Sequence, residues 1–75
     1  MAREDPRLVA GIRAADPATL EPIIREYLPQ IERAGRGAGL TAHEAEEVAQ
    51  ATFVTFIETA PRFEGRSKVR TWIFG

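Results

Sequence analysis

The feature that most constrains the fold is an apolar stripe between residues 20 and 34. Its apolar side chains recur every three or four positions, which is the repeat that lines one face of an α-helix. The members of the stripe are Leu20, Ile23, Ile24, Tyr27, Leu28, Ile31 and Ala34. No stretch alternates apolar and polar residues as a half-buried strand does, so the sequence predicts an all-α fold.

Capping signals delimit the first two helices. Asp5-Pro6 and Asp16-Pro17 each join a capping side chain to a proline suited to a first helical turn. These signals predict a helix over about residues 6–15 and a second one from residue 17. Pro29 lacks an amide hydrogen, so we expect either a kink or a break near Leu28, and the continuing stripe favours the kink.

The sequence Thr41-Ala42-His43-Glu44 is a capping box that predicts a third helix from about Ala42 to Thr59. Its inward residues are predicted to be Ala45, Val48, Ala49, Thr52, Phe53, Phe56, Ile57 and Ala60. Ser67 is the predicted cap of a last helix that stops at Gly75. Together these elements predict a single compact three-helix bundle plus the start of a fourth helix.

The 75 residues carry a formal net charge of −1, but the charge is unevenly divided. Residues 41–60 hold four glutamates and no Lys or Arg, which sums to −4. Residues 61–75 hold Arg62, Arg66, Lys68 and Arg70 against Glu64, which sums to +3. The two segments therefore suit partners of opposite charge, unless both are simply solvated surface.

Several classes of protein are disfavoured by what the sequence lacks. The chain contains no cysteine, so it can form neither a disulfide nor a thiolate metal site. His43 and Glu47 could share a metal, but a solvated histidine beside the capping box is favoured because a third ligand is missing. We expect no enzymatic activity and no cofactor. No apolar run approaches the roughly 20 residues of a membrane span, so the expected location is the cytoplasm.

Two surfaces remain as candidates for binding. The outer face of the third predicted helix carries Glu47, Gln50, Ala51, Val54 and Glu58, a small and apolar strip rimmed by carboxylates that suits a basic partner helix. The closing segment places aromatic residues among basic ones, which suits unpaired nucleic acid. In the alternative interpretation, Phe63 and Trp72 seal the core and the basic side chains are only solvated.

Two stretches resemble one family. "AEEVAQATFVTFI" (45–57) and "FEGRSKVRTWIF" (63–74) resemble region 2 of the extracytoplasmic-function sigma factors of bacterial RNA polymerase. "LVAGIRAADPATLEPIIREYLPQIERAG" (8–35) is similar to the opening helices of that family. The resemblance implies a non-enzymatic transcription initiation factor domain that recognises and melts the promoter −10 element.

The resemblance also implies roles for individual residues. Glu47, Gln50, Ala51 and Val54 match the helix that binds the clamp helices of the polymerase β′ subunit. The loop from Phe63 to Lys68 matches the one that captures a flipped base of the non-template strand. The implied DNA-binding residues are Phe63, Gly65, Arg66, Ser67, Lys68, Arg70, Thr71 and Trp72.

The chain departs from the family pattern at Ala51, where glutamate is common, and at Ile57, where tryptophan is common. Gly75 stands where the family helix continues, so we expect a fragment that lacks the rest of this helix and the domain that reads the −35 element. An anti-sigma factor is an expected partner. Exposure of Trp72, Ile73 and Phe74 is expected to favour self-association.

Two other functions remain open on the sequence. One is a helical protein-interaction adaptor that does not bind DNA. The other is a helix-turn-helix reader of duplex DNA, which the charge disfavours because it would place Glu44, Glu46 and Glu47 against phosphates.

Overall fold

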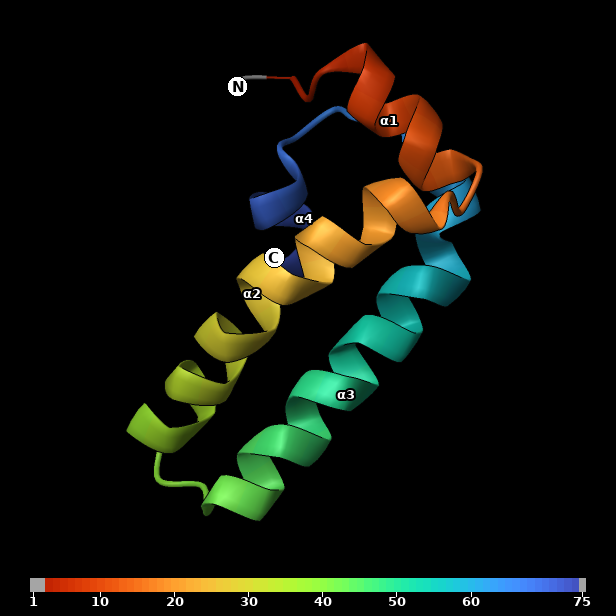
Figure 1. The fold of residues 1–75 in the computed structure, drawn as a ribbon. Helices are drawn as coiled ribbons and strands as arrows, with labels where there is room; N and C mark the ends of the chain where they lie inside the picture. Colours follow the sequence, from red (N-terminus) through yellow and green to blue (C-terminus); the bar gives the residue numbers. More distant parts are fainter. Residues whose placement is uncertain (1–2, 75) are drawn as a thin grey trace.

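The computed structural model describes residues 3–74, and within this range every regular element is a helix. The elements are α1 (Pro6–Arg13), α2 (Pro17–Gly37), α3 (Ala42–Thr59), the short 3-10 helix η1 (Ala60–Arg62) and α4 (Val69–Phe74). Helices α2 and α3 lie side by side and run in opposite directions, and α1 and α4 lie near the end where α2 begins and α3 finishes (Figure 1). The predicted all-α fold is confirmed, and Gly75 lies outside the described residues.

Both predicted aspartate caps are present. The Asp5 carboxylate accepts a hydrogen bond from the Arg7 amide at 2.9 Å, and the Asp16 carboxylate accepts one from the Ala18 amide at 3.1 Å. Helix α1 ends at Arg13, two residues before the predicted end, because Ala15 adopts a positive φ of 52° that turns the chain toward α2.

Helix α2 continues through both of its internal prolines to Gly37. The predicted alternative of a break near Leu28 is therefore wrong. The apolar stripe explains the continuity, because Ile23 on one side of Pro29 and Ile31 on the other are both buried in the same core. Burial of that stripe offsets the hydrogen bond that Pro29 cannot make.

The capping box of α3 forms as predicted. The Glu44 amide donates to the Thr41 hydroxyl at 3.1 Å, and the Thr41 amide donates to the Glu44 carboxylate at 2.9 Å. The hydrogen bond from the Thr41 amide to the carboxylate is the main cause of a lowered pKa of Glu44.

Replacing Thr41 with alanine is expected to lower the free energy of unfolding by about 1 kcal/mol, because the Glu44 amide loses its side-chain partner. Urea denaturation followed by circular dichroism measures the change. Thr41→Ser keeps the hydroxyl and should stay close to the wild type. Equal stability of Thr41→Ala and the wild type would contradict this role of the cap.

The buried core joins all the helices. Its members are Ile12, Leu20, Ile23, Ile31, Ala49, Phe53, Phe56, Ala60, Phe63 and Val69. Two residues predicted to face inward are instead exposed, Val48 at 45% and Ile57 at 43%. Both lie at the margins of the inward stripe of α3, and the prediction drew that stripe too wide because α2 covers only the central part.

Candidate functional site

The segment that links η1 to α4 forms a small hollow at one end of the bundle. We call residues 62–72 the basic elbow. The hollow has a volume of about 210 Å³ and is lined by Arg62, Phe63, Glu64, Gly65, Arg66, Ser67 and Trp72. Five of the eight residues whose resemblance implied DNA binding therefore surround one concave surface.

The two aromatic residues of the elbow differ in their accessibility. Phe63 is only 2% exposed and belongs to the core. Trp72 is half-buried, with its ring centroid 4.9 Å from that of Phe63 and 5.3 Å from that of Phe56. The indole therefore connects the core to the hollow, and Trp72 is the aromatic side chain that a ligand in the hollow can reach.

Gly65 is the tightest position of the elbow. Its φ is +73°, and a Cβ atom at this position would lie 2.5 Å from Cγ2 of Val9. Only glycine meets both the backbone conformation and the close approach to α1 without strain. The path of the elbow is thus fixed by α1, an element that the DNA-binding prediction did not include.

The basic side chains of the elbow have partners within the protein. Arg66 forms an exposed ion pair with Glu64 at 2.9 Å, and Lys68 lies 3.7 Å from the Glu4 carboxylate. The Arg70 guanidinium donates to the Gln30 side-chain oxygen at 2.7 Å and also lies 5.1 Å from the centroid of the Phe74 ring. Arg70 is thus directed toward α2, while Arg66 stays at the rim of the hollow.

Helix α4 begins differently from the prediction. The predicted cap was Ser67, but α4 starts at Val69, and the Val69 amide donates to the Glu4 carboxylate at 2.8 Å. The capping group therefore comes from the N-terminal segment. Ser67 is half-buried in the wall of the hollow, and Thr71 is exposed.

The outer face of α3 is exposed as predicted. Glu47, Gln50, Ala51 and Val54 are all exposed, and Val54 retains 54% of its accessible surface. Ile57, three residues beyond Val54, adds a second exposed apolar side chain that the sequence analysis had assigned to the core. Its spacing of seven from Gln50 and three from Val54 was the signal that could have placed it on this face.

The side chains at the start of this face interact with one another. The Gln50 amide group donates to Glu46 at 3.2 Å, and His43 lies 3.0 Å from Glu47. Within residues 3–74, no three His, Cys, Asp or Glu side chains are placed to hold a metal. His43 therefore pairs with Glu47 as a surface contact.

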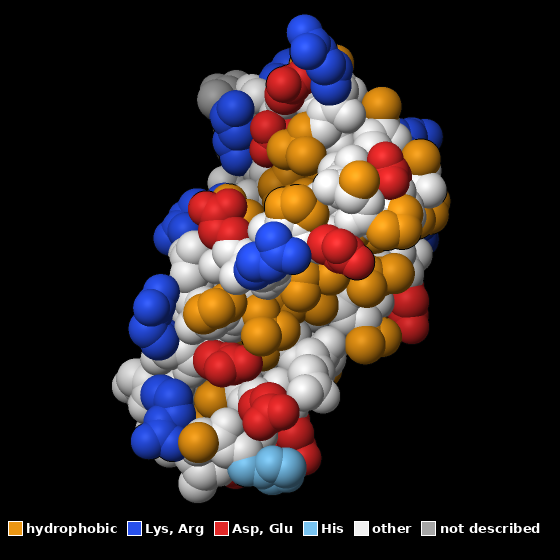
Figure 2. All heavy atoms as spheres, viewed as in Figure 1, with side chains coloured by type: hydrophobic (Ala, Val, Ile, Leu, Met, Phe, Trp, Pro, Cys, Tyr) orange, Lys and Arg blue, Asp and Glu red, His pale blue; other side chains and the backbone are white. Residues whose placement is uncertain are grey.

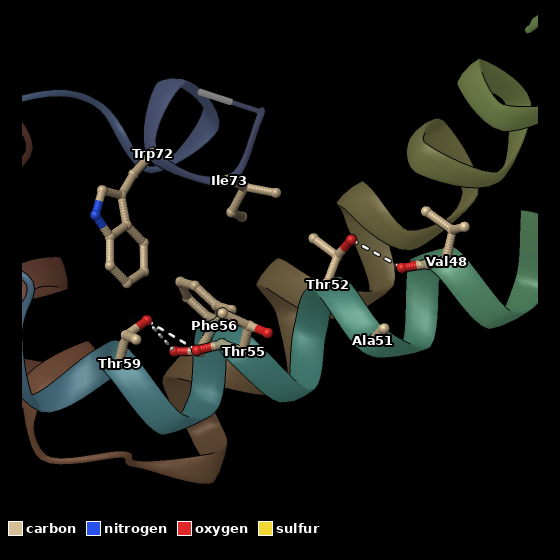
Figure 3. A pocket seen from close by; sticks show the side chains of 8 residues that line it. All are labelled: Val48, Ala51, Thr52, Thr55, Phe56, Thr59, Trp72 and Ile73. Carbon is tan, nitrogen blue, oxygen red and sulfur yellow. Dashed lines mark hydrogen bonds between the residues drawn. The ribbon is translucent and has the colours of Figure 1, made fainter.

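A second, apolar groove lies between α3 and α4 (Figure 3). It has a volume of about 560 Å³ and is lined by Val48, Ala51, Thr52, Thr55, Phe56, Thr59, Trp72 and Ile73. The Thr52 and Thr59 hydroxyls donate to the carbonyls of Val48 and Thr55, each at 2.8 Å. The groove wall is consequently mostly apolar.

Figure 2 shows hydrophobic side chains gathered over the middle of the face seen in Figure 1, with acidic and basic side chains around them. Of the three residues whose exposure the sequence analysis expected, Phe74 is 43% exposed, whereas Trp72 and Ile73 are half-buried. The described helices include none that is long and apolar enough to cross a lipid bilayer.

The family model for Sigma-70 region 2 matches residues 23–75. The chain matches no curated protein and no solved structure. The matched range contains most of α2, all of α3 and the basic elbow, and it leaves out Glu4 and α1. It covers well over half of the chain and includes both the elbow and the outer face of α3. The chain therefore belongs to the sigma-70 region 2 family, the non-enzymatic domain through which sigma factors take part in transcription initiation with RNA polymerase core and promoter DNA.

Proposed function

We propose that this chain is the region 2 domain of a sigma factor of the extracytoplasmic-function type. In this proposal, the outer face of α3 binds the β′ clamp helices of RNA polymerase. The basic elbow captures an unpaired base of the −10 element on the non-template strand.

The observation that carries the proposal is the hollow of the elbow. A concave surface bounded by Arg62, Arg66 and the indole of Trp72 combines cations for phosphates with an aromatic group for a base. Stacking on an aromatic side chain contributes about 1–3 kcal/mol per base, which offsets much of the cost of unstacking it. A duplex has no unpaired base to offer, so this site favours single strands.

The outer face of α3 supports the second half of the proposal. Val54 and Ile57 are exposed apolar side chains three residues apart, and Glu47 and Glu58 provide negative charge beside them. An amphipathic basic helix is the partner that such a strip suits. The strip and the hollow lie on different elements, so one domain can bind both partners at once.

Binding of a labelled −10 non-template strand should be stronger than binding of the duplex and should weaken as salt increases. Arg66→Ala should reduce the slope of log affinity against log salt by about 0.7, the value for one lost phosphate contact on a single strand. Fluorescence anisotropy measures both quantities. Arg33→Ala removes an exposed arginine near the far end of α2 and should leave the slope unchanged. Equal affinity for scrambled strands would refute recognition of the −10 element.

Binding of a purified β′ clamp-helix polypeptide should depend on the outer face of α3. Gln50→Ala or Glu47→Lys is expected to weaken it by about tenfold, since central interface residues typically contribute 1–2 kcal/mol. Isothermal titration calorimetry provides the affinity. Glu26→Lys makes the same charge change on α2 and serves as the control for non-specific electrostatics. Indifference to both α3 substitutions would refute the assignment of this face as the polymerase-binding surface.

A further inference from the structure

One residue of the N-terminal segment holds the basic elbow at two places. The Glu4 amide donates to the Gly65 carbonyl at 3.0 Å. The Glu4 carboxylate accepts the Val69 amide at 2.8 Å. The wall residues Arg66 and Ser67 lie between these two anchored positions, so Glu4 fixes both ends of the segment that forms one side of the hollow.

Helix α1 adds two further contacts to the same segment. The Arg13 guanidinium donates to the Phe63 carbonyl at 3.2 Å, and Val9 packs directly against Gly65. Glu4, Val9 and Arg13 all precede residue 23, where the family match begins. The elbow is therefore shaped in part by residues that precede the matched range.

The Glu4 carboxylate is almost enclosed, with only 9% of the side chain exposed. Burial alone would raise its pKa, but the amides of Val69 and Asp5 donate to it and Lys68 lies close by, so the net effect is a lowered pKa. Its contribution to stability is therefore present above its ordinary pKa of 4.5 and is lost as the pH falls through the lowered value. At neutral pH the Glu4 carboxylate is therefore charged and accepts the hydrogen bond from the Val69 amide of the elbow.

We propose that Glu4 is a positioning residue for strand binding at the basic elbow, an inference that rests on the proposed function of that elbow. Its carboxylate holds the start of α4, and its amide holds Gly65, so the hollow keeps the shape that a base requires. Glu4 does not itself attract DNA, because its negative charge lies beside Lys68 and opposes phosphate. The hydrogen bonds of Glu4 therefore favour strand binding, whereas its negative charge opposes it. Substitutions that remove one effect and keep the other can separate the two.

Glu4→Ala and Glu4→Gln provide the test. Alanine removes both the charge and the acceptor for the Val69 amide, whereas glutamine removes the charge and keeps an acceptor oxygen. We expect Glu4→Ala to weaken binding of the −10 strand by roughly three- to tenfold, the size of effect that follows from losing the net contribution of one typical hydrogen bond. Glu4→Gln should bind at least as tightly as the wild type, because less negative charge then faces the strand.

Two control variants isolate the positioning effect. Thr41→Ala removes a cap at the opposite end of α3, so it should lower stability without changing strand affinity. Glu46→Ala removes an exposed negative charge near the start of α3, outside the elbow, so it should leave strand binding unchanged. If Thr41→Ala weakened binding as much as Glu4→Ala, global stability would be the cause and the inference would fail. If Glu4→Ala bound the strand more tightly than the wild type, the charge of Glu4 alone would explain its effect on affinity, and the positioning inference would also fail.

Amide hydrogen exchange without DNA gives an independent readout. The Val69 amide should exchange faster in Glu4→Ala and at close to the wild-type rate in Glu4→Gln. If the wild type recognised the −10 strand and Glu4→Ala bound it with the same affinity, the positioning role would be overturned and the proposed function would remain intact. A wild-type chain that failed to discriminate the −10 strand would refute the proposed function, and the positioning role would fall with it.

Discussion

Replacing Phe56 with alanine is expected to lower the free energy of unfolding by about 3–5 kcal/mol, the usual cost of truncating a buried aromatic residue. Phe56 is 4% exposed, and its ring centroid lies 6.1 Å from that of Phe53 and 5.3 Å from that of Trp72. A domain of this length has a total stability of only about 4–11 kcal/mol. The variant should therefore be partly or wholly unfolded at room temperature, as measured by urea denaturation.

Two further substitutions test the cause of this loss. Phe56→Leu keeps most of the apolar volume and should lose clearly less stability than Phe56→Ala. Val54→Ala truncates an exposed residue of the same helix and should change stability by no more than about 0.5 kcal/mol. If Phe56→Ala cost no more than Val54→Ala, the packing of α4 on α3 through Trp72 would not be as described.

Gly65→Ala is expected to lower the free energy of unfolding by about 2–4 kcal/mol. Part of the cost comes from placing a Cβ on a residue with a φ of +73°, and part comes from the clash with Cγ2 of Val9, 2.5 Å from the new atom. Strand affinity should fall together with stability, because the elbow must move away from α1. Thermal unfolding and fluorescence anisotropy follow the two effects.

The clash and the backbone strain can be separated with a second substitution. Val9→Ala removes Cγ2, so the double variant should recover part of the loss, with a coupling energy of about 0.5–3 kcal/mol. Gly37→Ala is the matched glycine control, since a Cβ there meets nothing within 4 Å, and it should stabilise α2 by about 0.5–1 kcal/mol. Strictly additive effects of Val9→Ala and Gly65→Ala would contradict the steric explanation.

The helices could be predicted because their signals are local. The aspartate-proline pairs and the capping box fix where α1, α2 and α3 begin, and the structure confirms all three starts. The exposure of Val48 and Ile57 was harder to predict, because both lie at the margins of the inward stripe of α3. The spacing of Ile57 from Gln50 and Val54 also fits the outer face, and how much of α3 is covered by its neighbours decides between the two.

The candidate site was less accessible to prediction than the helices. The sequence correctly gathered basic and aromatic residues around one loop, but it could not show that Phe63 is buried or that Arg70 is directed toward Gln30. Glu4 was missed because it lies 65 residues before its partner Val69, and nothing in either local sequence indicates the contact. The roles of the remaining site residues stay predictions until binding is measured.

The long separation between Glu4 and Val69 has a consequence for the order in which the molecule folds. Contacts across 50 and 65 residues hold the elbow, whereas α2 and α3 are joined by a short turn and need little loop closure. We therefore expect the α2–α3 hairpin to form first and the elbow to open first in local unfolding. A molecule with an open elbow would still present the outer face of α3, so the domain could dock on a protein partner before its strand-binding end is assembled.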